Sequence, residues 1–151
     1  MFSITIEFLS LLLAALVVGA MFCVWLVFNP DGLPPSFYIA LQQRGVHTLH
    51  PAMPALGGAT ILTTLMAAIA KRADHLRLEM LLAATLCFVA AGLITRFLNQ
   101  PINAIMMTWN SSTPPAGWAT LRDAWWQWHQ VRLGAGLIGF ALIALVSLSC
   151  T

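Results

Sequence analysis

The stretch Phe8–Phe28, FLSLLLAALVVGAMFCVWLVF, decides the fold class of this chain. It contains no charged residue and is long enough, at about 1.5 Å per helical residue, to cross the roughly 30 Å of hydrocarbon in a bilayer. The preceding residues, Met1 to Glu7, contain no Lys or Arg, and no clear small-residue cleavage site follows the stretch. The pattern therefore predicts a retained membrane helix and not a signal peptide.

The composition places the whole chain in the membrane class. Of its 151 residues, 60% are hydrophobic and 8% are charged, and the mean hydropathy is +0.84. A soluble domain is about a quarter charged. The net charge of +2 is too small to indicate a nucleic-acid partner. Cys23, Cys87 and Cys150 stand singly in apolar segments, so we expect small buried side chains there and no disulfide framework or zinc ribbon.

Three further membrane spans can be drawn. They are predicted at about residues 54–70, at 78–98 with a continuation that can reach 109, and at 131–150. With the first span at 8–28, residues 1–151 form a single all-α domain, an integral membrane four-helix bundle with an amphipathic segment between helices 1 and 2. Small Gly and Ala residues in the second and fourth spans permit close helix contacts, which predicts a homo-oligomer in the lipid bilayer.

The basic residues predict how the bundle is oriented. The short connection Lys71–Arg77 holds three of the seven Lys and Arg residues, so it should face the cytoplasm. With four spans, both termini then also lie in the cytoplasm, and the long connections 29–53 and 99–130 share the opposite face. Five of the six tryptophans fall in the second of these connections, as an interfacial belt requires. We expect the inner membrane of a bacterium.

A first polar stripe lies where the third span should end. Four residues at i, i+3, i+4 and i+7 share one predicted helical face: Arg96, Asn99, Gln100 and Asn103. Pro101 removes a backbone donor and loosens the helix at the carbonyl of Phe97. The chain then turns apolar again up to Trp109, which indicates a pocket wall. The alternative is that Arg96 snorkels and the amides lie among lipid headgroups.

Two more polar stripes lie on the same side of the membrane. In LRDAWWQWHQVRL, which precedes the last span, one helical face carries Arg122, Trp125, Trp126, His129 and Leu133, with Arg132 at its edge. In SFYIALQQRGVHTLH, one face carries Ser36, Gln43, His47 and His50. The alternative is that the tryptophans only anchor the chain at the membrane interface and that His129 is a hydrogen-bonded histidine of the packed interior. The convergence of three stripes instead favours a site.

Together the stripes predict a pocket for an oxygenated, partly apolar small molecule. In this hypothesis His129 is the base, Arg122 and Arg132 stabilise the anion, and Asn99 and Asn103 position the substrate. Further contacts are expected from Arg96, Gln43, Gln100, Trp109, Trp125 and Trp126. Such a site can ionise a C–H bond beside a carbonyl. The carbanion can then react with O2 without a metal or flavin, so no cofactor is expected.

The motif residues also resemble those of a known family. Asn99-Gln100-Pro101-Ile102-Asn103, followed by Trp109, Trp118, Arg122, Trp125, His129 and Arg132, is similar to the anthrone oxygenase-like family of small four-helix membrane proteins. The upstream LQQ…HPAMPALG is similar as well. The resemblance implies the same fold. It further implies oxidation of an anthrone to an anthraquinone without a cofactor, although most members of this family have no assigned function.

Two other functions fit the same residues. His47, His50 and His129 could together hold copper, zinc, iron or a haem in a membrane redox protein, because imidazole suits these metals. Alternatively, the chain is a non-enzymatic carrier or accessory subunit, and the stripes only line helix interfaces. Elemental analysis separates the metal-dependent hypothesis from the cofactor-free one.

Overall fold

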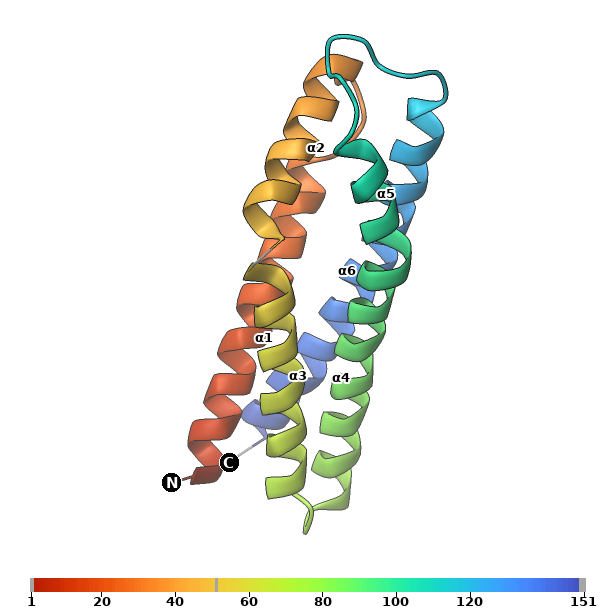
Figure 1. The fold of residues 1–151 in the computed structure, drawn as a ribbon. Coiled ribbons are helices and arrows are strands. Elements are labelled where there is room, and N and C mark those ends of the chain that lie inside the picture. Colours follow the sequence, from red (N-terminus) through yellow and green to blue (C-terminus); the bar gives the residue numbers. More distant parts are fainter. Residues whose placement is uncertain (1, 51, 150–151) are drawn as a thin grey trace.

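The computed structural model describes residues 2–50 and 52–149, and every regular element in this part of the chain is helical (Figure 1). The elements are α1 (Phe2–Val27), α2 (Pro35–Leu49), α3 (Ala52–Ala70), α4 (His75–Ile94), the π-helical segment η1 (Thr95–Asn99), α5 (Gln100–Met106) and α6 (Trp118–Leu148). Four stretches are long and apolar enough to cross a membrane: Ile4–Val27, Ala52–Ala70, His75–Met106 and Trp118–Leu148. The predicted all-α, four-helix integral membrane fold is confirmed.

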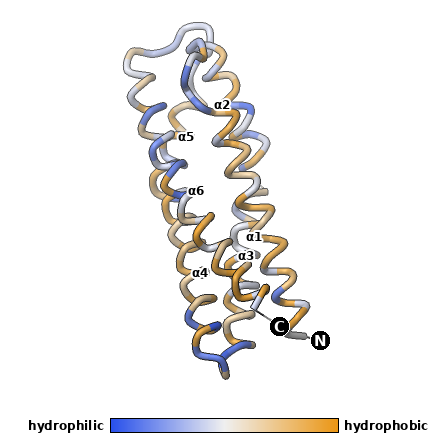
Figure 2. The backbone as a smooth tube through the Cα atoms, turned by 180° about the vertical axis from the view of Figure 1, so that it is seen from behind, coloured by the Kyte–Doolittle hydropathy of each residue, from blue (hydrophilic) through white to orange (hydrophobic). Residues whose placement is uncertain are grey.

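One end of the bundle carries the basic turn between α3 and α4. There Lys71 Nζ lies 2.8 Å from Glu7 Oε1 near the start of α1, and Arg77 Nη2 donates to the Ser149 carbonyl, at 2.7 Å, just after α6. The start of α1, the basic turn and the end of α6 therefore lie together, as the four-span topology requires. We call this the basic end, and the opposite one the α2 end. Figure 2 shows hydrophobic residues along most of the helices and hydrophilic ones at the basic turn.

The helices are longer than the hydropathy pattern predicts. α1 begins at Phe2 and not near Phe8, and α6 begins at Trp118, well before 131. The segment with the tryptophans, which we expected ahead of the last span, is therefore the first part of that span's own helix. Gly117 precedes it with a φ of 78°, a left-handed conformation that favours glycine. Polarity marks where the chain leaves the hydrocarbon, whereas a helix can continue into the interface.

α2 is the amphipathic helix predicted between the first two spans. Pro35 occupies its first turn, where a missing N–H costs nothing. The buried face carries Tyr38, Ile39 and Gln42. Gly45 lies within the helix and packs against the Phe28 ring. The last residue of α2 lies next to the start of α3, and α2 extends the line of α3 toward the α2 end of the bundle (Figure 1). There α2 packs beside α5.

The bundle core is closed by small residues where helices approach. Ala14, Ala67 and Ala84 are completely buried. A Cβ on Gly139 would lie 2.9 Å from the Phe88 ring and 3.2 Å from the Ala84 carbonyl oxygen, so α6 and α4 touch there. Of the glycines that predicted a homo-oligomer, Gly136 and Gly139 thus have close contacts within the chain. The homo-oligomer stays a prediction.

Gly139→Val should lower the free energy of unfolding by about 1–3 kcal/mol relative to Gly134→Val, because it overpacks the α4–α6 contact. Gly134 lies on the same helix, and a Cβ added to it would have no atom within 4 Å, so it is a matched control. Both variants gain the same helix propensity, and only the packing differs. Unfolding in mixed detergent micelles measures the difference. Equal free energies of unfolding for the two variants would show that the α4–α6 contact at Gly139 has room for a larger side chain.

The third membrane helix runs through η1 into α5 without a break. The Gln100 N–H bonds to the Thr95 carbonyl, five residues earlier, as in a π-helix. Pro101 follows directly. In a regular α-helix, a proline lacks the N–H donor and its ring clashes with the carbonyl four residues before it. The wider π-turn leaves room for the ring of Pro101. The loosening predicted at this point is therefore present, and the helix extends to Met106, close to the expected continuation.

Candidate functional site

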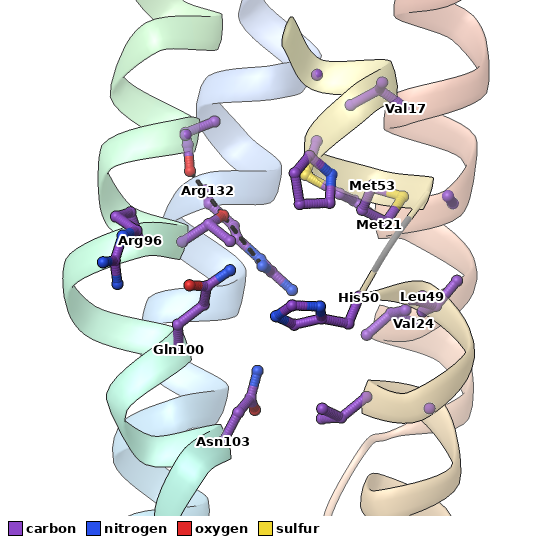
Figure 3. Close-up of a pocket in the computed structure, with 18 of the residues that line it drawn as sticks. Val17, Met21, Val24, Leu49, His50, Met53, Arg96, Gln100, Asn103 and Arg132 are labelled. Atoms are coloured by element: carbon purple, nitrogen blue, oxygen red, sulfur yellow. Dashed lines mark hydrogen bonds between the residues drawn. The ribbon is translucent and has the colours of Figure 1, made fainter.

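A cavity of about 380 Å³ lies in the half of the bundle near the α2 end. Figure 3 looks into it, with α4, η1 and α5 on one side and α2 and α3 on the other. Most of its lining is apolar, including Val17, Met21, Val24, Phe28 and Phe88. Its polar lining consists of Gln42, His50, Thr95, Arg96, Gln100, Asn103, Trp125 and Arg132. It is thus an apolar pocket with a concentrated polar region.

Arg132 brings a positive charge to this cavity from α6. Its Nε and Nη2 lie 3.0 and 2.8 Å from Nδ1 of His129, and its Nη1 donates to Thr95 Oγ1 at 3.1 Å. In the described part of the chain no carboxylate forms an ion pair with it. A guanidinium has five N–H donors, so these contacts leave some of them without a partner. The partly buried cation therefore has the capacity to bind an anion.

His129 holds Arg132 in place. Its ring is completely buried and stacks on Trp125, with 5.3 Å between the ring centroids and 3° between the planes. Nε2 lies 3.1 Å from the Met21 carbonyl oxygen, which can only accept, so Nε2 carries the proton. Nδ1 is then the acceptor that Arg132 needs. Both ring nitrogens are engaged, and the ring is not part of the cavity lining, which differs from the predicted role as a base facing the substrate.

His50 faces the cavity from the end of α2. Figure 3 shows its ring pointing toward Arg132 and Gln100. The structure gives this ring no hydrogen bond or ion pair to residues 2–50 or 52–149. It is the histidine whose side chain can meet a molecule in the cavity.

Amide side chains line the cavity toward the α2 end. Gln42, with 1% exposure, donates from Nε2 to Asn103 Oδ1 at 3.2 Å. Its Oε1 and the Nε1 of Trp125 are buried without a hydrogen-bond partner among the described residues. Buried polar atoms are nearly always bonded in native proteins. These two atoms, one acceptor and one donor, are therefore candidate contacts for a bound molecule.

A family model described as "Anthrone oxygenase" matches residues 43–142 of the 151. The chain belongs to the anthrone oxygenase family. The match covers every polar cavity residue except Gln42. No curated protein and no solved structure matches the chain.

In this anthrone oxygenase family member, the polar stripe on the third membrane helix is split. Arg96, Gln100 and Asn103 line the cavity, whereas Asn99 is completely buried and donates to the Trp125 carbonyl at 3.0 Å. The four residues were expected on one face of a regular helix. The π-turn changes the angle between successive side chains, and so directs Asn99 toward α6.

Several other predicted site residues do not line the cavity of this family member. Gln43 donates to the carbonyls of Met106 and Trp109, at 3.0 and 2.8 Å, and so fastens the end of α5. Arg122 bonds to Asp123 at 2.8 Å and lies 4.8 Å from the centroid of the Trp118 ring. Trp126 packs on the His129 ring. Gln43 and Trp126 therefore support elements that surround the cavity, whereas Arg122 contacts residues outside its lining.

Tyr38 is a completely buried residue on α2. Burial raises the pKa of the Tyr38 hydroxyl well above its usual value, which keeps the hydroxyl protonated. Its ring lies 6.1 Å from that of Trp118, and its oxygen has no partner in the described part of the chain. Tyr38 closes the α2 end of the bundle without reaching the cavity.

The three-histidine metal site is not assembled in this family member. His47 is exposed and does not line the cavity, and His129 is buried behind Arg132. Among residues 2–50 and 52–149, no group of three His, Cys, Asp or Glu side chains is placed to hold a metal ion. The i, i+3 spacing of His47 and His50 predicted that both would share one helical face, but only His50 lines the cavity.

Two polar cavity residues of this family member were missed in the sequence. Gln42 and Thr95 are neighbours of the predicted Gln43 and Arg96. Gln42 shares the buried face of α2 with Tyr38 and Ile39, which is an informative signal: a lone amide on an apolar face needs a polar partner inside the protein. Thr95 carried no comparable signal, because threonines within membrane helices commonly bond to their own backbone.

Proposed function

We propose that the chain is a membrane oxygenase that uses O2 to oxidise a hydrophobic phenol, anthrone or quinone-like molecule. The supporting observation is the guanidinium of Arg132, which faces His50 in an apolar cavity and has no carboxylate partner among the described residues. The cavity volume of about 380 Å³ lies near the lower end of the roughly 300–1,000 Å³ typical of small-molecule sites. It suits a compact ring system better than a two-chain lipid.

The first step is removal of a proton from carbon. His50 accepts a proton from the ring methylene group that lies opposite the substrate carbonyl, and the electron pair moves through the conjugated rings onto the carbonyl oxygen as an enolate. Arg132 stabilises this oxyanion, because a fixed cation in a water-poor site is worth far more than in water. The amide side chains of Gln100 and Asn103 form hydrogen bonds with oxygen substituents on the rings of the substrate. His129 acts through Arg132, whose guanidinium it keeps aimed at the cavity.

The second step uses the electron-rich carbon. It transfers an electron to O2 and the two radicals combine, which forms a C–O bond to a peroxide. Protonated His50 returns its proton to the distal oxygen. Loss of the second methylene hydrogen as a proton, with cleavage of the O–O bond, gives a new carbonyl and water. The sum converts CH2 and O2 into C=O and H2O, and needs no electrons from a resident cofactor.

The placement in the cell follows the charge pattern. We propose that the basic end with its Lys71–Arg77 connection faces the cytoplasm of a bacterium, and that the cavity belongs to the outer half of the inner membrane. A hydrophobic substrate concentrates in the same hydrocarbon.

Turnover by the purified protein tests the proposal. In lipid nanodiscs, the wild-type chain should convert anthrone to anthraquinone faster than empty nanodiscs do, with one O2 consumed for each anthrone. An oxygen electrode and absorbance follow the two quantities. We expect elemental analysis to find no stoichiometric copper, zinc or iron. A rate equal to that of empty nanodiscs would refute the oxygenase, and tight binding without turnover would instead identify a carrier.

A further inference from the structure

The cavity has one exposed side. Its deep wall is formed by buried residues of α1, α4 and α6, such as Met21, Phe88 and Trp125. The exposed residues in its lining are His50, Pro54, Gly58, Gly92 and Arg96. They belong to the α2–α3 side and to the α4–η1 side, which face one another in Figure 3. The opening therefore lies between α3 and α4, on the side of the bundle.

The opening lies at the depth of the lipid tails. Gly92 is about 25 Å along the helix from His75 at the basic end, within the roughly 30 Å of a hydrocarbon core. Arg96 follows one turn later, near the boundary. On α3, Leu62 is one turn from Gly58 on the same face and is 59% exposed, as a lipid-facing residue would be. A molecule dissolved in the bilayer meets this opening without passing through water.

Neither packing nor backbone geometry explains the glycines at the rim. No atom lies within 4 Å of a Cβ placed on Gly58 or Gly92, and neither residue has a positive φ. Gly139, in contrast, is pressed against Phe88, and Gly117 has a φ of 78°. Glycine weakens a helix interior relative to alanine. What the two rim glycines provide is the absence of a side chain across the opening.

The interior gives a ligand polar contacts that lipid tails cannot use. The buried Oε1 of Gln42 and the free N–H groups of Arg132 lie inside the cavity, beyond the rim glycines. We infer that a compact oxygenated ring compound passes sideways from the bilayer between α3 and α4, and that Gly58 and Gly92 set the size of molecule admitted. The identity of the ligand rests on the proposed function, whereas the route rests on the opening itself.

The rates of ligand binding test this route. Anthraquinone is added in lipid vesicles to the chain in nanodiscs, and quenching of tryptophan fluorescence is followed by stopped flow. Gly58→Leu and Gly92→Leu should each slow both association and dissociation by about tenfold, with little change in Kd, because a narrower passage affects both directions. Gly19→Leu is the control, since Gly19 is exposed on α1, has no atom near its Cβ and does not line the cavity.

Three outcomes would overturn the inference. Wild-type rates in both rim variants would mean that the ligand uses another route. A weaker Kd with an unchanged association rate would mean that the leucines occupy the binding site and not the passage. Absence of binding to the wild-type chain would refute both the route and the proposed function. If the wild-type chain binds anthraquinone but never oxidises anthrone, only the oxygenase proposal fails, and the rates still decide the route.

Discussion

Arg132→Met should lower kcat/KM for anthrone oxidation by about 100- to 1,000-fold, the loss that follows removal of one oxyanion-stabilising donor. Methionine fills a similar volume but carries neither the charge nor the N–H groups. The enolate would then form in an apolar cavity with no cation to stabilise it. Steady-state rates of anthraquinone formation measure the effect, and a drop in kcat larger than the rise in KM would show that Arg132 acts on the transition state.

Two further arginine variants make this result specific. Arg132→Lys keeps the charge but cannot reproduce the contacts of the guanidinium with both His129 and Thr95, so we expect only partial activity. Arg44→Met removes an arginine that is exposed on α2 and does not line the cavity, and should leave the rate unchanged. If Arg132→Met retained the wild-type rate, the cation would have no role in the chemistry.

The membrane fold could be predicted from the sequence because it depends on properties that sum over many residues. Twenty apolar residues in a row cross a bilayer whatever their neighbours are, so Phe8–Phe28 predicted its helix. The ends of the helices depend on single residues. Trp118 begins α6 because Gly117 permits the turn before it, and the hydropathy of the tryptophan-rich segment carries no trace of that.

The site was predicted less completely, because it depends on the direction in which each side chain points. The regular period that grouped Arg96 with Asn99 holds only for an α-helix, and the π-turn before Pro101 breaks it. A sequence also does not show which ring nitrogens of a histidine are hydrogen-bonded to neighbouring residues. In the sequence, two arginines at helical spacing from His129 indicated a catalytic base. In the structure, Arg132 and the Met21 carbonyl engage both of its ring nitrogens.

His50→Asn should reduce kcat by about 100- to 10,000-fold, the usual contribution of a general base. Asparagine keeps a polar side chain at the end of α2 but cannot accept the proton. Imidazole added to the assay should restore part of the rate, because the opening between α3 and α4 leaves room for a small base. His75→Asn, at the basic end of the bundle, is the control and should behave as the wild type does.

The other histidines decide between the proposed mechanisms. His129→Asn should reduce the rate less than His50→Asn does, since it disturbs only the aim of Arg132. The opposite order would restore His129 to the role that the sequence predicted. His47→Asn should have no effect, because that exposed side chain lies outside the cavity. An equal loss in His47→Asn and His50→Asn, with metal lost from both, would instead mean that the two imidazoles act as ligands and that the first step is not proton transfer to a free base.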